Sequence, residues 1–393
     1  MNPPKKSLIP APVLLLGAVS FFNDIASEML YPVMPIFLTQ ILGAPIFVVG
    51  IIDGVAEGLS SSLKTVFGYL SDKTQKRKPF IVSGYFTSAL SKLVIATAFT
   101  WPMVFFGRVL DRFGKGMRTG ARDAMLLEYT NEHNKGFVFG VHRSLDSSGA
   151  IIGPIIALFL LHAFSDNIRI ILAIAAIPSF IGLLLFFFIR EARKHTATHH
   201  SLSFWANMKT LSPQLKLFFL TIGIFSLGNS TDSFLILRSK ELGLTITGVV
   251  LVYIVYNIFY AVLSTPAGSL ADKIGARYVY PLGLVIFALV YFGFAFNTNP
   301  AFLWLLFAVY GGYIALTDGV SKALIGGLIK HEEAGTVYGV SQTIISITTL
   351  LASVIGGLLW SAFGSYTTFL FGAICSLVSL ITFLPLINTG KKN

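Results

Sequence analysis

The sequence predicts an all-α membrane protein with twelve transmembrane helices arranged in two six-helix halves. Of its 393 residues, 54% are hydrophobic and 12% are charged, and the mean hydropathy is +0.75. This charged fraction is about half that of a typical soluble domain. Apolar stretches of about 20 residues, each long enough to cross a bilayer as a helix, recur along the whole length. One long polar connection interrupts them near the middle.

Breaks at prolines, glycines and charge clusters delimit the expected spans. These spans are 11–40, 45–70, 79–99, 101–124, 137–162, 168–190, 214–238, 245–270, 278–297, 301–328, 336–361 and 366–388. The first span is too long for a cleaved signal peptide and carries polar residues at its centre, so we expect it to be retained. The predicted domains are an N-terminal bundle at 1–190, a cytoplasmic central loop at 191–213 and a C-terminal bundle at 214–393.

Loop charges orient the protein, because cytoplasmic loops of membrane proteins carry an excess of lysine and arginine. Most basic loop residues fall on one side of the predicted membrane, and they are Lys5, Lys6, Lys73, Lys76, Arg77, Lys78, Lys135, Arg193, Lys194, Lys273, Arg277, Lys330, Lys391 and Lys392. The other side has little beyond Arg169, Arg238 and Lys240. We therefore expect both termini in the cytoplasm, and we attribute the net charge of +11 to topology rather than to nucleic-acid binding.

Several kinds of site are not expected. The single cysteine, Cys375, excludes an internal disulfide and any cysteine-based metal cluster. No phosphate-binding G-x-x-x-x-G-K-[ST] loop and no H-E-x-x-H motif occurs, so we expect neither ATP-driven transport nor enzymatic activity, and no cofactor. The histidines of the central loop, His195, His199 and His200, could bind a metal, but a solvated linker is the simpler interpretation.

The two halves also repeat. The segment Gly68-Tyr-Leu-Ser-Asp72-Lys73 recurs 200 residues later as Gly268-Ser-Leu-Ala-Asp272-Lys273. Further matches between the halves join Asn23-Asp24 to Asn229 and Asp232, Asp111 to Asp318, and Lys115 to Lys322. Parallel six-helix repeats place a substrate site near the middle of the membrane, between the halves.

On these residues the sequence resembles the major facilitator superfamily, whose most specific element is the duplicated G-x-L-[SA]-D-[RK] loop. The stretch D-R-x-G-K-G-x-R, at 111–118, resembles that of a widespread bacterial subgroup. The resemblance implies a secondary transporter with alternating access, usually driven by a proton or sodium gradient. We accordingly expect a multi-pass protein of the bacterial inner membrane, acting as a monomer on a small-molecule substrate.

Span one carries the first candidate site. Asp24 and Glu28 lie one turn apart on a polar arc of about 100°, with Asn23 at its margin. Two carboxylates so close in a low dielectric resist simultaneous ionisation, which suits a proton carrier. The alternative is a static ion pair with an arginine of span four or five.

Spans two, three and five add further intramembrane charges. Asp53, Glu57, Ser60 and Lys64 share one arc of span two, and Glu57 joins Asp24 and Glu28 as a proton-coupling candidate. Lys92 of span three needs a partner, for which Glu57 or Asp53 is the obvious candidate. Span five supplies His142, Arg143 and Asp146. Its glycines, Gly140, Gly149 and Gly153, resemble an antiporter motif of the family, although close helix packing explains them more simply.

Span four carries a charged stripe within an arc of about 140°. Its members are Arg108, Asp111, Arg112, Lys115, Arg118, Arg122 and Asp123. We expect the outer part, from Arg108 to Lys115, to line the cavity and favour an anion. We expect the inner part to brace the Gly68–Lys73 loop, with Asp72 pairing with Arg118 or Arg122. Alternatively, Asp111 and Asp146 neutralise these arginines and no ligand touches them.

The C-terminal half carries fewer intramembrane charges. The polar residues Asp53, Glu57, Ser60 and Lys64 of span two correspond there to Tyr253, Asn257, Tyr260 and Ser264. Neutral and aromatic residues continue at Tyr310, Tyr313, Gln342 and Ser346. This asymmetry suits a polar ligand held ionically on one side and packed against rings on the other. It would also follow if only the proton machinery lay in the N-terminal half.

The predicted function is proton-coupled transport of a small polar, anionic solute, such as an organic acid, a polycarboxylate siderophore or a phosphorylated metabolite. The expected substrate contacts are Asn23, Arg108, Asp111, Arg112, Arg143, Asp146, Tyr253, Asn257, Tyr260 and Asp318. The expected cytoplasmic gate comprises Gly68, Asp72, Lys73, Arg118, Arg122, Asp123, Gly268, Asp272 and Lys273.

Three alternatives stay open. One is a multidrug/proton antiporter, suggested by the glycines of span five and the 35 phenylalanines. Another is a divalent-metal transporter that uses Asp24, Glu28 or Asn23 with His142. The last is a non-transporting sensor or an enzyme, which the absence of a catalytic constellation disfavours.

Overall fold

The computed structural model describes residues 10–74, 76–130, 135–189, 212–329 and 334–388, and within these ranges the chain is helical, without strands. The helices of the first part are α1 (Ala11–Leu30), α2 (Met34–Ile36), the π-helical turn η1 (Phe37–Ile41), α3 (Ile46–Thr74), α4 (Lys78–Ala96), α5 (Trp101–Glu128), α6 (Lys135–Ala163), α7 (Ile168–Ile174), α8 (Ala176–Leu185) and the 3₁₀ turn η2 (Phe186–Phe188). Those of the second part are α10 (Pro213–Gly228), α11 (Ser233–Glu241), α12 (Ile246–Ile274), α13 (Ala276–Phe296), the 3₁₀ turn η3 (Pro300–Phe302), α14 (Leu303–Gly326), α15 (Ala334–Phe363) and α16 (Ser365–Asn388).

Eleven of the helical stretches in the described residues are long and apolar enough to cross a membrane. The remaining long helix is α5, whose charges make it too polar to qualify by composition. Counting α5 gives the twelve predicted spans, so the predicted all-α class is confirmed. The central loop predicted at 191–213 lies almost wholly outside the described residues, as do His195, His199 and His200, and the domain boundaries stay a prediction.

Two predicted spans are interrupted. Span one ends as a regular helix at Leu30, because Pro32 and Pro35 lack the N–H that would continue its hydrogen-bond ladder. Span seven breaks between Gly228 and Ser233, which separates α10 from α11. Elsewhere the boundaries follow local chemistry: Ser212 and Thr245 cap the starts of α10 and α12. Gly275 adopts a φ of 97°, which allows the chain to reverse between α12 and α13.

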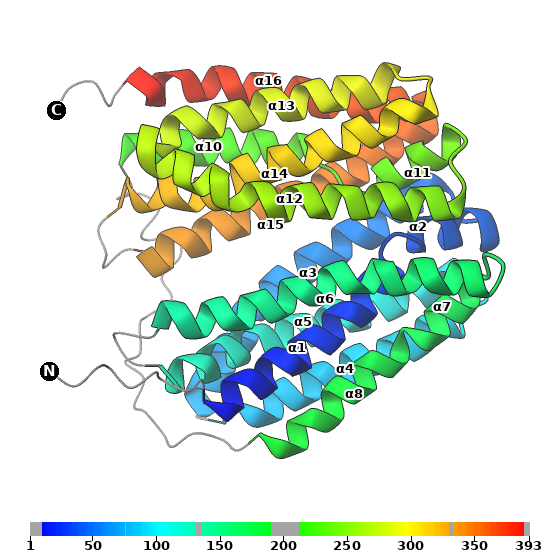
Figure 1. Cartoon of the computed structure of the whole chain (residues 1–393). Coiled ribbons are helices and arrows are strands. Elements are labelled where there is room, and N and C mark those ends of the chain that lie inside the picture. The colour runs from blue at the N-terminus through cyan, green and yellow to red at the C-terminus, as the bar shows by residue number, and fades with distance from the viewer. Residues whose placement is uncertain (1–9, 75, 131–134, 190–211, 330–333, 389–393) are drawn as a thin grey trace, which may run out of the picture. The chain divides into compact units, whose positions relative to one another are not determined.

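The chain forms two compact units. Unit 1 contains the described residues of Met1–Tyr31 and Ser62–His199, and unit 2 contains those of Pro32–Ser61 and His200–Asn393. The division passes through α3, whose first half belongs to unit 2. In unit 1, α1 packs along α6 and α8, and α4 packs along α5 (Figure 1).

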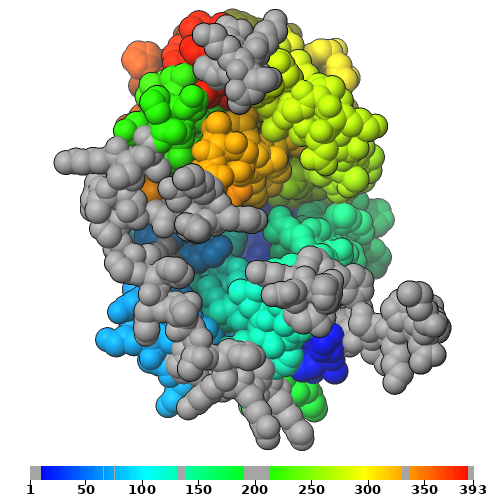
Figure 2. Space-filling view, turned by 90° about the vertical axis from the view of Figure 1, so that its left-hand side faces the viewer, coloured from blue at the N-terminus to red at the C-terminus, as the bar shows by residue number. Residues whose placement is uncertain are grey.

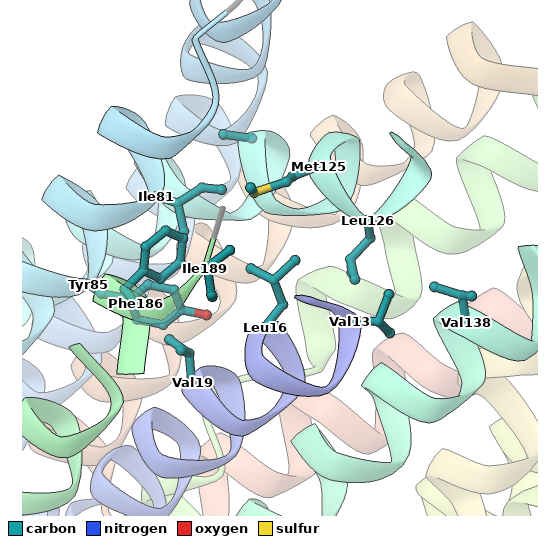
Figure 3. Packing of buried hydrophobic residues seen from close by; sticks show 11 residues of the cluster. Val13, Leu16, Val19, Ile81, Tyr85, Met125, Leu126, Val138, Phe186 and Ile189 are labelled. Atoms are coloured by element: carbon teal, nitrogen blue, oxygen red, sulfur yellow. The ribbon is translucent and has the colours of Figure 1, made fainter. Parts of the chain in front are cut away.

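An apolar cluster fills the interior of unit 1. Leu16 and Val19 of α1 lie near Tyr85 of α4 and Phe186 of η2 (Figure 3). The Tyr85 and Phe186 rings are 6.4 Å apart. This cluster fixes α1 against α4, and it thereby sets the position of the polar face of α1.

Unit 2 is held together mainly by aromatic residues. Its α12 packs along α14, α13 along α14 and α16, and α10 along α15 and α16. Figure 2 shows this unit from the helix ends, with α10 in green and α12 in yellow-green. The rings of Phe287 and Tyr291 stack at 3.9 Å, and Phe225 meets Phe287 edge-on at 4.9 Å.

Candidate functional site

Two acids from different helices meet in unit 1. Asp24 of α1 and Asp146 of α6 lie within hydrogen-bonding reach of each other. Ser20 donates its hydroxyl to Asp146 Oδ1 at 2.8 Å. A hydrogen bond between two carboxyl groups requires an O–H on one of them, so this pair can hold one proton between its members.

Two glycines allow this approach. A Cβ at Gly149 would lie 2.5 Å from the Phe21 carbonyl oxygen and 3.1 Å from Asp24 Cβ. A Cβ at Gly153 would lie 2.7 Å from the Ile25 carbonyl oxygen. Gly140, in contrast, has nothing within 4 Å. The glycine pattern of span five therefore marks the close contact of α1 with α6, as the packing interpretation predicts.

Basic residues surround the acid pair. Arg122 donates to Ser20 Oγ at 2.9 Å and forms an ion pair with Asp123 at 3.0 Å. Arg143 Nη1 lies 3.5 Å from Asp146 Oδ2, but the Arg143 side chain is 70% exposed. His142 is buried, and its Nε2 has no hydrogen-bond partner among the described residues.

The remaining acids predicted to couple protons occupy different surroundings. Glu28 is half-buried on α1 and influences Asp24 less strongly than Asp146 does. Asp24 therefore pairs with an acid of another helix rather than with its neighbour along α1. Glu57 is exposed on the part of α3 that belongs to unit 2. Asn23 is buried, and its Oδ1 has no hydrogen-bond partner among the described residues.

The structure corrects the predicted partner of Lys92. Lys92 Nζ lies 3.2 Å from Asp111 Oδ1 of α5 rather than beside Glu57 or Asp53. Asp111 also interacts electrostatically with Arg108, Arg112 and Arg118. Four bases thus surround one acid along the α4–α5 contact, and such a concentration of positive charge can attract an anion.

The predicted pairing of Asp72 with Arg118 or Arg122 is wrong. Asp72 forms an ion pair with Arg77, which also reaches Glu128 at 3.4 Å. Arg118 instead donates to Ser88 Oγ at 2.5 Å and lies over the Tyr85 ring at 4.5 Å. The sequence pattern could not reveal this, because Arg118 faces α4 whereas Asp72 lies near the end of α3.

The remaining residues of the predicted gate differ in their burial and contacts. Gly68 lies against Gly120 of α5, where a Cβ on Gly120 would be 3.0 Å from Gly68 Cα. Lys73 is exposed, as are Asp272 and Lys273 of the second copy. A Cβ at Gly268 would have nothing within 4 Å, so this glycine marks no close helix contact.

In unit 2, the predicted substrate residues contact one another. Asn257 donates to the Tyr253 carbonyl oxygen at 3.0 Å, and Tyr260 donates to Asp318 Oδ2 at 3.2 Å. Asp318 also pairs with Lys322 at 2.9 Å. Tyr253 is buried, whereas Asn257 and Tyr260 are half-buried.

The sequence-based site omitted the break between α10 and α11. Asp53 of α3 accepts hydrogen bonds there from Thr231 and Ser233, and Asp232 accepts one from Tyr310. The signal was present, because the run Gly228-Asn-Ser-Thr-Asp232 favours a turn over a helix and its Asn229 and Asp232 match Asn23-Asp24. For metals, the described residues contain no group of three histidine, cysteine, aspartate or glutamate side chains that could hold an ion.

Comparison with known proteins decides the family. The sequence pattern of the Major Facilitator Superfamily matches residues 16–237 and 217–393. The chain belongs to the major facilitator superfamily. It is 36% identical over 373 residues to an uncharacterised MFS-type transporter of Methanocaldococcus jannaschii, covering 93% of this chain and 92% of the relative. As a superfamily member with many apolar helices, it is a multi-pass membrane transporter.

More distant relatives and solved structures carry functional names. The multidrug resistance protein MdtH of Blochmanniella pennsylvanica is 23% identical, with 92% of this chain and 93% of the relative covered. Among solved structures, the nucleoside transporter NupG superposes with a TM-score of 0.80 at 14% identity, covering 96% of this chain and 99% of that one. This structural likeness shows the shared fold alone.

Proposed function

We propose that this transporter moves a small polar, anionic solute by proton-coupled alternating access across the plasma membrane, with both termini in the cytoplasm. The observation that carries the proposal is the contact between Asp24 and Asp146. Intramembrane acids are costly and mark functional sites by default. A pair that shares one proton can load and release it as the surroundings change.

The basic residues along α5 support the anionic character of the solute. Arg108 and Arg112 lie near the buried Asp111, which Lys92 already pairs with. A carboxylate or phosphate group suits arginine, whose planar fork binds such anions through two hydrogen bonds. Organic acids, polycarboxylate siderophores and phosphorylated metabolites all carry such groups.

The proposal is tested with purified protein and then with proteoliposomes. A thermal-shift screen should show stabilisation by citrate or glucose 6-phosphate rather than by ethidium. In liposomes, an imposed pH gradient should drive accumulation of the stabilising anion, and a protonophore should abolish it. Accumulation that persists with the protonophore would contradict proton coupling.

A second candidate is a multidrug/proton antiporter. It is favoured by relatives that are named as multidrug resistance proteins or efflux pumps, among them the PmrA homologue of Lactococcus lactis at 25% identity. The same screen separates the two candidates. Stabilisation by ethidium, with ethidium extrusion driven by the pH gradient and no response to anions, would favour the antiporter.

A further inference from the structure

The break between α10 and α11 brings a second pair of acids together, this time within unit 2. Asp53 comes from α3, and Asp232 immediately precedes α11. The two carboxylates lie close enough for the charge of Asp53 to act on Asp232. Unit 2 therefore contains an acid pair in a span that the internal repeat relates to the span of Asp24.

The two acids have different partners. Asp53 Oδ2 accepts hydrogen bonds from Thr231 Oγ1 at 2.9 Å and from Ser233 Oγ at 2.5 Å. These donors stand at the start of α11, where the helix dipole also favours a negative charge. Asp53 thus holds the broken helix in position through these hydrogen bonds.

Asp232 faces tyrosine hydroxyls and one other acid. It accepts a hydrogen bond from Tyr310 of α14 at 2.6 Å, and Tyr256 of α12 also hydrogen-bonds to it. Tyr291 of α13 and Tyr313 of α14 complete the titratable groups that face it, with Asp53 of α3. No lysine, arginine or histidine within the described ranges forms an ion pair with Asp232. A carboxylate in a membrane span needs a compensating positive charge, and a proton is the smallest one.

Two buried oxygen atoms beside Asp232 provide the second observation. Ser230 Oγ and Tyr291 OH have no hydrogen-bond partner of suitable geometry among the described residues, and the two residues are 6% and 0% exposed. Tyr291 nevertheless lies within hydrogen-bonding reach of Ser230 and Tyr310, and close enough to Asp232 to interact with its charge. A buried hydroxyl that makes no hydrogen bond of good geometry is costly. A protonated Asp232 would donate its O–H, and these oxygen atoms can accept it.

We propose that Asp232 is a second proton-binding site, so that unit 2 carries a proton independently of the Asp24–Asp146 pair. In the ionised state Tyr310 donates to the Asp232 carboxylate. In the protonated state Asp232 keeps the Tyr310 bond and gains an acceptor at Ser230 or Tyr291. Two close carboxylates resist simultaneous ionisation, so a single proton bound by this pair of acids relieves their repulsion.

Infrared difference spectroscopy of the full-length protein tests this site without any substrate. Acidification of the wild type should produce a carbonyl band of a protonated carboxyl group that Asp232→Asn removes. Tyr310→Phe should shift that band, because the hydrogen bond to the Asp232 carboxyl is lost. Asp166→Asn, an exposed loop position with a φ of 61° that asparagine also adopts, serves as the matched control and should leave the band unchanged.

Two results would overturn the site. One is an Asp232→Asn spectrum identical to that of the wild type. The other, decisive if Asp232→Asn does not fold, is a Tyr310→Phe spectrum without any shifted carboxyl band. Asp24→Asn should remove a different band, so this test and the test of the proposed function can fail independently.

Discussion

Lys92 Nζ lies 3.2 Å from Asp111 Oδ1 where α4 packs along α5, and the two side chains are only 1% and 10% exposed. Ser91 also reaches Asp111 Oδ1 at 3.5 Å, and Lys92 Nζ donates to the Ser88 carbonyl oxygen at 3.3 Å. This buried pair anchors the basic face of α5 within unit 1. Asp111 accordingly serves the helix contact, whatever its role toward a solute.

Asp111→Asn should destabilise the protein, because it leaves Lys92 buried among other positive charges without its counter-charge. Removing one partner of a buried pair costs about 3–5 kcal/mol. Thermal unfolding in detergent should show a clear drop in midpoint. Asp166→Asn makes the same chemical change at an exposed position and should leave the midpoint within about a degree of the wild type. An equally stable Asp111→Asn variant would show that the ion pair is dispensable.

Gly149→Ala should push α1 away from α6. The new Cβ would lie 2.5 Å from the backbone oxygen of Phe21, which cannot move without shifting α1. Overpacking of this kind costs about 1–3 kcal/mol, and it should also separate Asp24 from Asp146 and weaken pH-driven accumulation. Gly140→Ala is the control from the same helix, since its Cβ would meet nothing within 4 Å. Equal behaviour of the two variants would contradict the proposed role of the α1–α6 contact.

The sequence predicted where the helices lie in the chain better than it predicted which helices pack together. Hydropathy was enough to predict the helical spans. An apolar segment inside a membrane must make its backbone hydrogen bonds internally, and a helix does so. Helical periodicity also placed Asp24 and Lys92 on polar faces. It could not tell which helix each face meets, so the sequence predicts Glu57 or Asp53 as the partner of Lys92, and it sets Asp24 with Glu28 or with an arginine of span four or five. Those pairings depend on helix packing, to which Gly149 and Gly153 contribute.

The interrupted helices show a second limit. A window of hydropathy averages over Asn229 to Asp232 and predicts one continuous span. The turn-forming residues are visible in the sequence, but their consequence is not. Only the packing of α3 and α14 against the break brings Asp53 and Tyr310 to Asp232 and its neighbours.

Arg112→Ala should weaken binding of the anion selected in the thermal-shift screen by about tenfold or more, because a hydrogen bond to a charged group is worth about 1.5–3 kcal/mol. Arg112→Lys should restore only part of the affinity, since it keeps the charge but loses the planar fork. Arg277→Ala removes the same charge in the first turn of α13 and should bind as the wild type does. Unchanged affinity in Arg112→Ala would remove this residue from the site.

Accumulation by proteoliposomes containing Asp24→Asn tests the central claim most directly. The asparagine preserves the size of the side chain but cannot share an exchangeable proton with Asp146. We predict that pH-driven accumulation of the selected anion falls to the level of protein-free liposomes, while exchange of internal for external anion continues. Asp166→Asn should accumulate the anion as the wild type does. Full pH-driven accumulation by Asp24→Asn would contradict the account.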